Sequence, residues 1–150
     1  MNTKVKMQRV CDIADYFLNR QEDDCQDVIT HLKLQKLCYY AQGFYLAMNN
    51  CRLFVNDIVA WQHGPVVIEL YDKYKEYGSA ALPLSPDFDL DKIPADVQDF
   101  LDDVYSEYGQ YSAWKLRNMT HCEPPWKNAV RRDGVLSDKD MIDFFKTQIA

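Results

Sequence analysis

Residues 30–50, which read THLKLQKLCYYAQGFYLAMNN, decide the fold. Thr30 suits the N-cap of a helix, because its hydroxyl can accept a hydrogen bond from an unpaired amide of the first turn. Asn49 and Asn50 can end that helix. The apolar residues between them recur at helical spacing and cover about a third of the circumference. They are Leu34, Leu37, Cys38, Ala41, Phe44, Tyr45 and Met48. We expect this helix to be the spine of the core.

The other side of the same helix is unusual for a surface that faces solvent. Gln35, Lys36, Tyr39 and Gly43 point away from the apolar stripe, and Tyr40 lies on its flank. Aromatic side chains and a glycine suit a second packed surface. We favour a central helix that its own domain covers on both sides, and an exposed partner-binding surface is the alternative.

Apolar periodicity and capping residues predict further helices along the chain. The first is expected over about Lys6–Asn19, and one near the middle has Pro65 at its first helical position and Gly78 as its C-terminal cap. Others are expected from near Pro94 to Gly109, after Ser112 with Trp114 and Leu116 as anchors, and after the capping box of Ser137 and Asp140. The last of these carries Met141, Ile142, Phe145 and Ile149.

One short segment has the period of a strand. Residues 58–63 alternate in character, and Phe54-Val55 could be the hairpin partner, with Asn56-Asp57 in the turn. The whole pattern predicts a mainly α protein. We expect a single compact helical domain over residues 1–150, with about six helices and a small antiparallel β-hairpin between helices 2 and 3.

The charge of the chain narrows the class of partner. The 150 residues carry a formal net charge of −6, and only short basic groups such as Arg131-Arg132 occur. A nucleic-acid partner is therefore disfavoured, because binding requires Lys and Arg to neutralise phosphates. No apolar run approaches the ~20 residues of a membrane span, and no apolar segment follows the basic N-terminus. We expect a cytoplasmic protein without a signal peptide.

Few side chains suit catalysis or metal binding. The cysteines contain no C-x-x-C pair and are expected to be reduced thiols. A Cys–His hydrolase could combine Cys38 or Cys122 with His63 or His121, but no glycine-rich elbow accompanies a cysteine. We expect His63 and His121 to hold turns by hydrogen bonds. A zinc site that also used Cys51 would lack a chelating pair of ligands. The five cysteines are Cys11, Cys25, Cys38, Cys51 and Cys122.

We therefore expect no catalytic residue, no metal and no cofactor. A small Cys/His hydrolase and a nucleic-acid-binding regulator are the alternatives to a protein that acts by binding another protein.

Three stretches resemble the motifs of a known family. Residues 32–43, LKLQKLCYYAQG, are similar to a K-L-Q-K-L-x-Y-Y-A-Q-G helix. Residues 53–78 are similar to an L-F pair, an I-x-A-W-x-x-G-P-V core and a helix that ends in Y-G. Thr120-His121 with Pro125-Trp126 resembles T-H-x-x-x-P-W. On these motifs, which span about Val10 to Val130, the chain resembles the SocA-like Panacea-domain family of bacterial and phage antitoxins.

The resemblance implies a function in protein binding. Members are usually antitoxins that neutralise the toxin of a neighbouring gene by direct complex formation, and many are found in prophages or other mobile genetic elements. In the SocA branch the antitoxin is also a proteolytic adaptor that delivers its toxin to the ClpXP protease. The resemblance thus implies a cognate toxin as partner, with ClpXP as a further one.

The family has no established catalytic residues, so its motif positions carry over as signature residues and candidate toxin contacts. Tyr39, Tyr40, Trp61 and His63 are the positions that we expect at a functional surface. The full set of signature residues is Lys33, Gln35, Lys36, Tyr39, Tyr40, Gln42, Gly43, Trp61, His63, Gly64, Pro65, Val66, Thr120, His121, Pro125 and Trp126.

Overall fold

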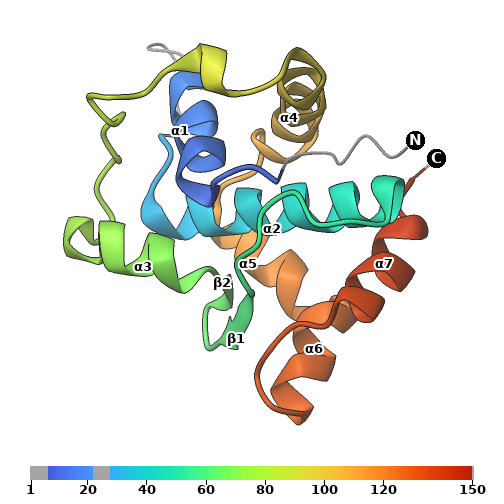
Figure 1. Ribbon diagram of the computed structural model, residues 1–150. Coiled ribbons are helices and arrows are strands. Elements are labelled where there is room, and N and C mark those ends of the chain that lie inside the picture. The colour runs from blue at the N-terminus through green and yellow to red at the C-terminus, as the bar shows by residue number, and fades with distance from the viewer. Residues whose placement is uncertain (1–6, 22–27, 150) are drawn as a thin grey trace, which may run out of the picture.

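The structure is a computed structural model that describes residues 7–21 and 28–149. This part of the chain is mainly α-helical, as predicted, with seven α-helices where about six were expected, and one two-stranded antiparallel sheet between α2 and α3 (Figure 1). The α-helices are α1 (Val10–Arg20), α2 (His31–Asn49), α3 (Ile68–Tyr74), α4 (Ala95–Tyr108), α5 (Ala113–His121), α6 (Pro124–Arg131) and α7 (Asp138–Lys146). The strands are β1 (Val59–Trp61) and β2 (Gly64–Val66), and the short 3-10 helices are η1 (Lys75–Tyr77) and η2 (Leu90–Lys92).

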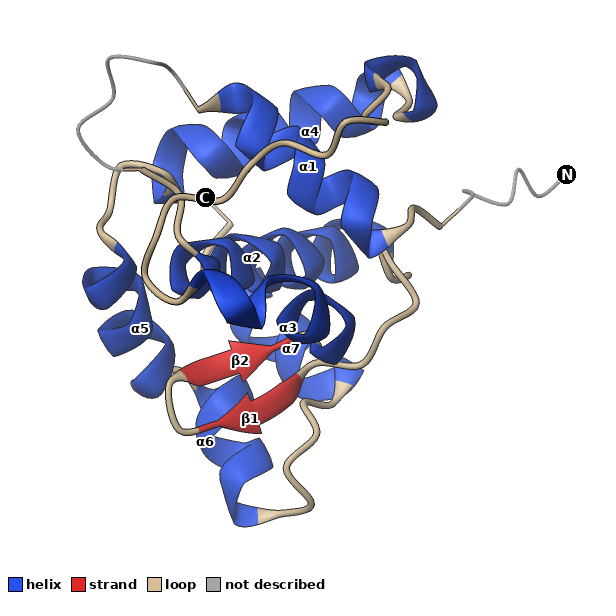
Figure 2. Cartoon of the chain, turned by 90° about the vertical axis from the view of Figure 1, so that its left-hand side faces the viewer, coloured by secondary structure: helices blue, strands red, loops and turns tan. Residues whose placement is uncertain are grey.

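Helix α2 lies at the centre of the fold. Helices α1, α4, α5 and α7 all pack against it, and strand β2 and helix α3 contact it as well (Figures 1 and 2). Its predicted apolar stripe is buried at Leu34 and Leu37, and its opposite side is equally buried at Lys36 and Tyr39. The prediction that its own chain covers this helix on both sides is confirmed. Met48, at its C-terminal end, is instead 59% exposed.

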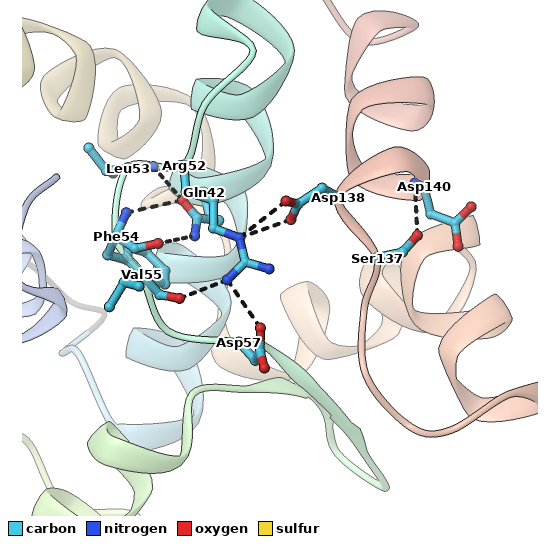
Figure 3. Close-up of polar contacts among 9 residues, drawn as sticks. All are labelled: Gln42, Arg52, Leu53, Phe54, Val55, Asp57, Ser137, Asp138 and Asp140. Atoms are coloured by element: carbon cyan, nitrogen blue, oxygen red, sulfur yellow. Dashed lines mark hydrogen bonds and ion pairs between the residues drawn. The ribbon is translucent and has the colours of Figure 1, made fainter. Parts of the chain in front are cut away.

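Side-chain caps start the helices where the sequence indicates. The Thr30 hydroxyl accepts a hydrogen bond from the Lys33 N–H at 3.3 Å, and the Ser112 hydroxyl accepts one from Lys115 at 3.1 Å. Ser137 caps α7 in the same way, with the Asp140 N–H at 3.1 Å (Figure 3). Asn50 ends α2 with a φ of 57°, in the left-handed region that Asn tolerates better than most residues.

The β-hairpin occupies the expected place between α2 and α3, and β1 lies within the predicted segment 58–63, but the partner strand and the turn were assigned wrongly. Strand β1 pairs with β2, with Ala60 opposite Pro65, so the turn is Gln62-His63 and not Asn56-Asp57. Phe54 instead forms a parallel bridge with Gln8. Since Phe54 pairs with Gln8 and Val59 also bridges to Val135, tertiary pairing overrides the local alternation of the sequence.

One proline-containing segment was also interpreted wrongly. Pro65 lies in strand β2 and not at the start of a helix, and α3 begins three residues later at Ile68. Pro124 and Pro125 form the first turn of α6. Proline is compatible with both settings, because its fixed φ suits a helix start and its missing N–H suits an unpaired strand position.

Several boundaries and core positions differ from the prediction. Helix α3 ends at Tyr74, and Gly78, with a φ of 56°, follows η1. Trp114, predicted as an anchor of α5, is 59% exposed, while Leu116 is fully buried. Ile149 lies beyond α7 and is 44% exposed. Lys6, the predicted start of the first helix, and Cys25 lie outside the described residues.

Candidate functional site

Gln42 anchors the segment that follows α2. Its Oε1 accepts hydrogen bonds from the N–H groups of Leu53 (2.7 Å) and Phe54 (3.3 Å), and its Nε2 donates to the Phe54 carbonyl at 2.7 Å (Figure 3). A buried amide side chain thus provides the partners that a neighbouring strand would otherwise give this backbone. The role of Gln42 in the structure is to hold the L-F pair of the family motif.

Arg52 lies beside this anchor and joins the same segment to the last helix. Its guanidinium contacts Asp57 at 3.1 Å and Asp138 at 3.0 Å, and it donates to the Val55 carbonyl at 2.7 Å (Figure 3). Its side chain is 25% exposed. The loop after α2 is therefore held to the central helix on one side and to the start of α7 on the other.

Gln35 holds the start of α3 from the same central helix. Its Oε1 accepts from the Val67 N–H at 2.8 Å, and its Nε2 donates to the Val67 carbonyl at 3.2 Å. The same amide nitrogen lies 3.0 Å from Nε2 of His31. Since Val67 has no side-chain cap, Gln35 replaces one.

Two lysines of α2 are buried and reach backbone carbonyls. Lys33 Nζ donates to the Gly109 carbonyl at 2.7 Å, and Lys36 Nζ donates to the Pro65 carbonyl at 3.2 Å. Burial, together with a smaller effect of the nearby Arg117, lowers the pKa of Lys36 to about 7. Lys36 is therefore an amine that the fold buries against a backbone carbonyl, with no ion pair to a carboxylate within the described residues.

Tyr39 and Tyr40 converge on a carboxylate that the motifs do not specify. Their hydroxyls donate to the two oxygens of Glu123, each at 2.8 Å. Burial raises the pKa of Glu123 to about 7, although both hydrogen bonds act in the opposite direction. The Tyr40 ring also stacks on Tyr108, with centroids 4.0 Å apart. The sequence did not identify Glu123, which occupies a variable position of the T-H-x-x-x-P-W pattern. The available signal was that Tyr39 and Tyr40, if buried, need a hydrogen-bond acceptor for their hydroxyls.

The hairpin and the third motif meet at one corner. Trp126 Nε1 donates to the Trp61 carbonyl at 2.9 Å, and the Trp126 ring lies 4.2 Å from that of His121. Gly64 has a φ of 113°, and a Cβ there would come within 2.6 Å of Lys36 Cε and 2.9 Å of Thr120 Oγ1. The structure thus brings all three motif stretches together around the first half of α2.

The signature residues differ in exposure. Of the four that were expected at a functional surface, Trp61 is 38% exposed and His63 is exposed, whereas Tyr39 and Tyr40 are buried. His121 and Trp126 are partly exposed. The remaining signature residues are buried: Lys33, Gln35, Lys36, Gln42, Gly43, Gly64, Pro65, Val66, Thr120 and Pro125.

A hollow of about 280 Å³ opens at this corner, between α2, the hairpin, α3 and α5. Its walls include His31, Lys36 and Tyr71, and the two exposed tryptophans Trp61 and Trp114 also line it. Burial lowers the pKa of His31, and Lys36 adds to that shift. The site is therefore an aromatic hollow in which burial disfavours the charged forms of His31 and Lys36.

The thiols and histidines that the structure describes do not form an arrangement typical of catalysis. Burial raises the pKa of the Cys38 thiol, and burial together with Glu69 raises that of Cys11 to about 11, whereas a nucleophilic cysteine needs a lowered pKa. Cys51 and Cys122 are exposed. Among the described residues, no group of three or more His, Cys, Asp or Glu side chains is placed to hold a metal ion.

Two general properties bear on the class of protein. In the described part of the chain, no helix has both the length and the apolar character that crossing a membrane requires. The free cysteines there are Cys11, Cys38, Cys51 and Cys122.

The chain was compared with known proteins. No curated protein and no solved structure matches it. The family model described as antitoxin SocA-like, Panacea domain, matches residues 34–127, a segment that begins inside α2 and ends inside α6 and so contains the hairpin corner and the hollow. This match covers more than half of the chain and supports an antitoxin role. The chain therefore belongs to the SocA-like Panacea-domain antitoxin family.

Proposed function

We propose that this protein is the antitoxin of a toxin–antitoxin system and neutralises a cognate toxin by binding it directly. The match of residues 34–127 to the antitoxin family carries the proposal. The contacts of the motif residues agree with it, because Gln35 and Gln42 fix backbone, and Tyr39 and Tyr40 are held by hydrogen bonds to Glu123. A scaffold held in this way suits binding, which needs rigid, complementary surface and no reacting group.

Residues 1–150 function as one domain in this proposal. Helix α2 packs against α1 near one end of the sequence and against α7 near the other, so neither half has a separate core. We place the protein in the cytoplasm, where a toxin made by a neighbouring gene would be met as it is synthesised. This is in keeping with its free thiols.

Co-expression with the neighbouring open reading frame tests the proposal. Expression of that neighbour alone should stop growth, and co-expression of this chain should restore it and yield a complex that purifies as one peak. A neighbour that is not toxic, or that is toxic but neither rescued nor bound, would contradict an antitoxin function.

A further part of the proposal is delivery of the toxin to ClpXP, as the SocA branch does. Purified ClpXP should degrade the toxin faster when this protein is present, while this protein itself persists through several rounds. Equal degradation rates with and without it would restrict the function to direct neutralisation.

A further inference from the structure

The hollow at the hairpin corner has the size of a docking site for a side chain. Its volume of about 280 Å³ lies below the roughly 300–1,000 Å³ that is typical of pockets for small molecules and cofactors. It is open to the surface, and Trp61 of the hairpin and Trp114 of α5 are exposed residues that line it. A protruding residue of another protein fits these dimensions better than a whole cofactor.

The base of the hollow is cationic. The Lys36 ammonium has three N–H donors, and the Pro65 carbonyl at 3.2 Å is its one hydrogen-bond acceptor within the described residues. Arg117 lies close enough to lower the pKa of Lys36, and its Nε is buried without a hydrogen-bond partner. Nε2 of His121, next to Arg117, is also buried without one. Lys36 Nζ thus has N–H donors beyond the one that Pro65 accepts, and the Arg117 Nε donor near it is unpaired within the described residues.

No acidic side chain lines the hollow. The net charge of −6 comes from carboxylates elsewhere, including the run of aspartates over residues 87–103. Burying a cation without a counter-ion costs free energy. A carboxylate that enters the hollow offsets this cost and forms charge-assisted hydrogen bonds with the cation. Charge complementarity at this point therefore selects an anion, although the protein as a whole is acidic.

The rim supplies an apolar surface around that cationic base. Trp61 is 38% and Trp114 is 59% exposed, and Ile68 and Tyr77 nearby in the fold are 46% and 43% exposed. Both indoles are supported from within: Trp61 packs edge-on against Tyr71 at 4.8 Å, and the Arg117 guanidinium lies 4.5 Å from the Trp114 ring. Supported tryptophans around a charged centre are the residues that most often dominate binding energy at interfaces.

We propose that the hollow binds an acidic side chain of the partner protein that has apolar neighbours. Its carboxylate pairs with Lys36 and Arg117, and its neighbours pack on Trp61 and Trp114. In identifying the partner as the toxin, this inference rests on the proposed function. The chemistry of the site itself does not, and the two can be tested separately.

The first experiment tests the site without any toxin. Hexanoate, a carboxylate on an apolar chain, is titrated into the protein while the three tryptophan indole N–H signals are followed by NMR, with hexanamide as the uncharged control. Hexanoate should shift the Trp61 and Trp114 signals, and hexanamide should bind about tenfold more weakly because it lacks the charge-assisted hydrogen bonds. Equal binding of both probes, or none by hexanoate, would overturn the site.

Two variants remove one cation each. Lys36→Met removes the buried ammonium, and Arg117→Gln removes the second cation while leaving the bond to Pro65 intact. Both should abolish the preference for hexanoate over hexanamide. Thermal unfolding shows whether each variant is folded, and if Lys36→Met does not fold, Arg117→Gln alone decides the outcome.

The second experiment tests whether the toxin uses the site. Trp114→Ala should weaken toxin binding at least tenfold and impair growth rescue. Met48→Ala is the matched control, since Met48 is also 59% exposed but lies at the far end of α2.

If wild type and both variants bind the toxin equally, the toxin does not dock here and the antitoxin function stands. If hexanoate binds as expected but no toxin binds the wild-type protein, the antitoxin function fails and the carboxylate site stands.

Discussion

Gln35 and Val67 form a two-point hydrogen bond across 32 residues of sequence: the Gln35 amide accepts from the Val67 N–H at 2.8 Å and donates to its carbonyl at 3.2 Å. Both residues are buried, at 3% and 1% exposure. The contact joins the central helix to the segment between the hairpin and α3. It therefore fixes the wall of the hollow as well as the start of a helix.

Replacement of Gln35 by Ala should destabilise the protein measurably. The Val67 N–H would be left buried without a partner, and such a loss costs about 1–3 kcal/mol in unfolding free energy. Chemical denaturation monitored by circular dichroism measures this. Gln110→Ala is the control, because Gln110 makes only exposed contacts with Glu107 and should change the unfolding free energy little. Equal stability of the Gln35→Ala and wild-type proteins would show that the contact contributes nothing.

Glu123 should make the protein less stable as the pH rises from 4.5 to 7. Its pKa is raised from 4.5 to about 7 in the folded protein, chiefly by burial. The folded state therefore binds more protons than the unfolded state in this window, and its contribution to stability, complete below pH 4.5, is lost as the pH passes 7. The loss is on the order of 3 kcal/mol at most.

Glu123→Gln isolates this contribution. The amide keeps one acceptor for Tyr39 or Tyr40 but cannot titrate, so the difference in unfolding free energy between variant and wild type should change with pH across that window. Urea denaturation at a series of pH values measures it. A difference that stays constant with pH would mean that Glu123 titrates in the folded protein as it does in the unfolded chain.

Lys36 should have the opposite effect at higher pH. Burial lowers its pKa from 10.5 to about 7, so between these values the unfolded chain binds a proton that the folded protein does not. Stability therefore rises with pH from about 7 to 10.5.

Lys36→Met removes this pH dependence of stability. Because an apolar side chain replaces a buried cation, the variant should be as stable as wild type near pH 7 or more stable by about 1–4 kcal/mol. Melting temperatures over this range measure both effects; a strongly destabilised variant without the slope would indicate that the bond to Pro65 outweighs the cost of burial.

The sequence predicted those parts of the fold that depend on local chemistry. Thr30, Ser112 and Ser137 cap helices as expected because an N-cap hydroxyl acts within its own first turn. Pro65 was expected at a helix start and lies instead in strand β2, because proline alone does not distinguish a helix start from a strand position without an N–H partner. The assignment of Pro65 to a strand follows only from tertiary contacts. Ala60 pairs with Pro65, and the Ala60 N–H donates to the Gly134 carbonyl.

The site was predictable in its residues but not in its geometry. The three motif stretches contain Lys36, Trp61 and His121, which the fold brings to one corner. Trp114, which lines the hollow, and Arg117, which packs on the Trp114 ring, belong to no motif, and Trp114 was expected in the core on the strength of its apolar character. Apolar character indicates burial for most residues, yet an exposed tryptophan beside a hollow is also typical of a binding surface.

Loss of the exposed thiol of Cys122 should leave function intact. Cys122 follows the last residue of α5, and no shared site of metal-binding side chains is formed around it in the described chain. Cys122→Ala should therefore rescue growth in the presence of the toxin as well as wild type does. Rescue that depends on this thiol would instead support the Cys–His hydrolase that the sequence left as an alternative.

Gly43→Ala should disrupt the contact between α2 and α7. A Cβ at Gly43 would overlap the Phe145 ring, which is fully buried against Tyr39, Tyr40 and Phe44. Alanine favours a helix over glycine by about 1 kcal/mol, but overpacking a core typically costs about 1–3 kcal/mol and here meets an aromatic ring held on several sides. We expect a net loss of stability, seen as a lower denaturation midpoint.

In a Phe145→Leu background the smaller side chain makes room, so Gly43→Ala should cost less or become stabilising, with a coupling energy of about 0.5–3 kcal/mol in the double-mutant cycle. Additive effects of the two substitutions would show that the α2–α7 contact adjusts elsewhere and that Gly43 is not required for it.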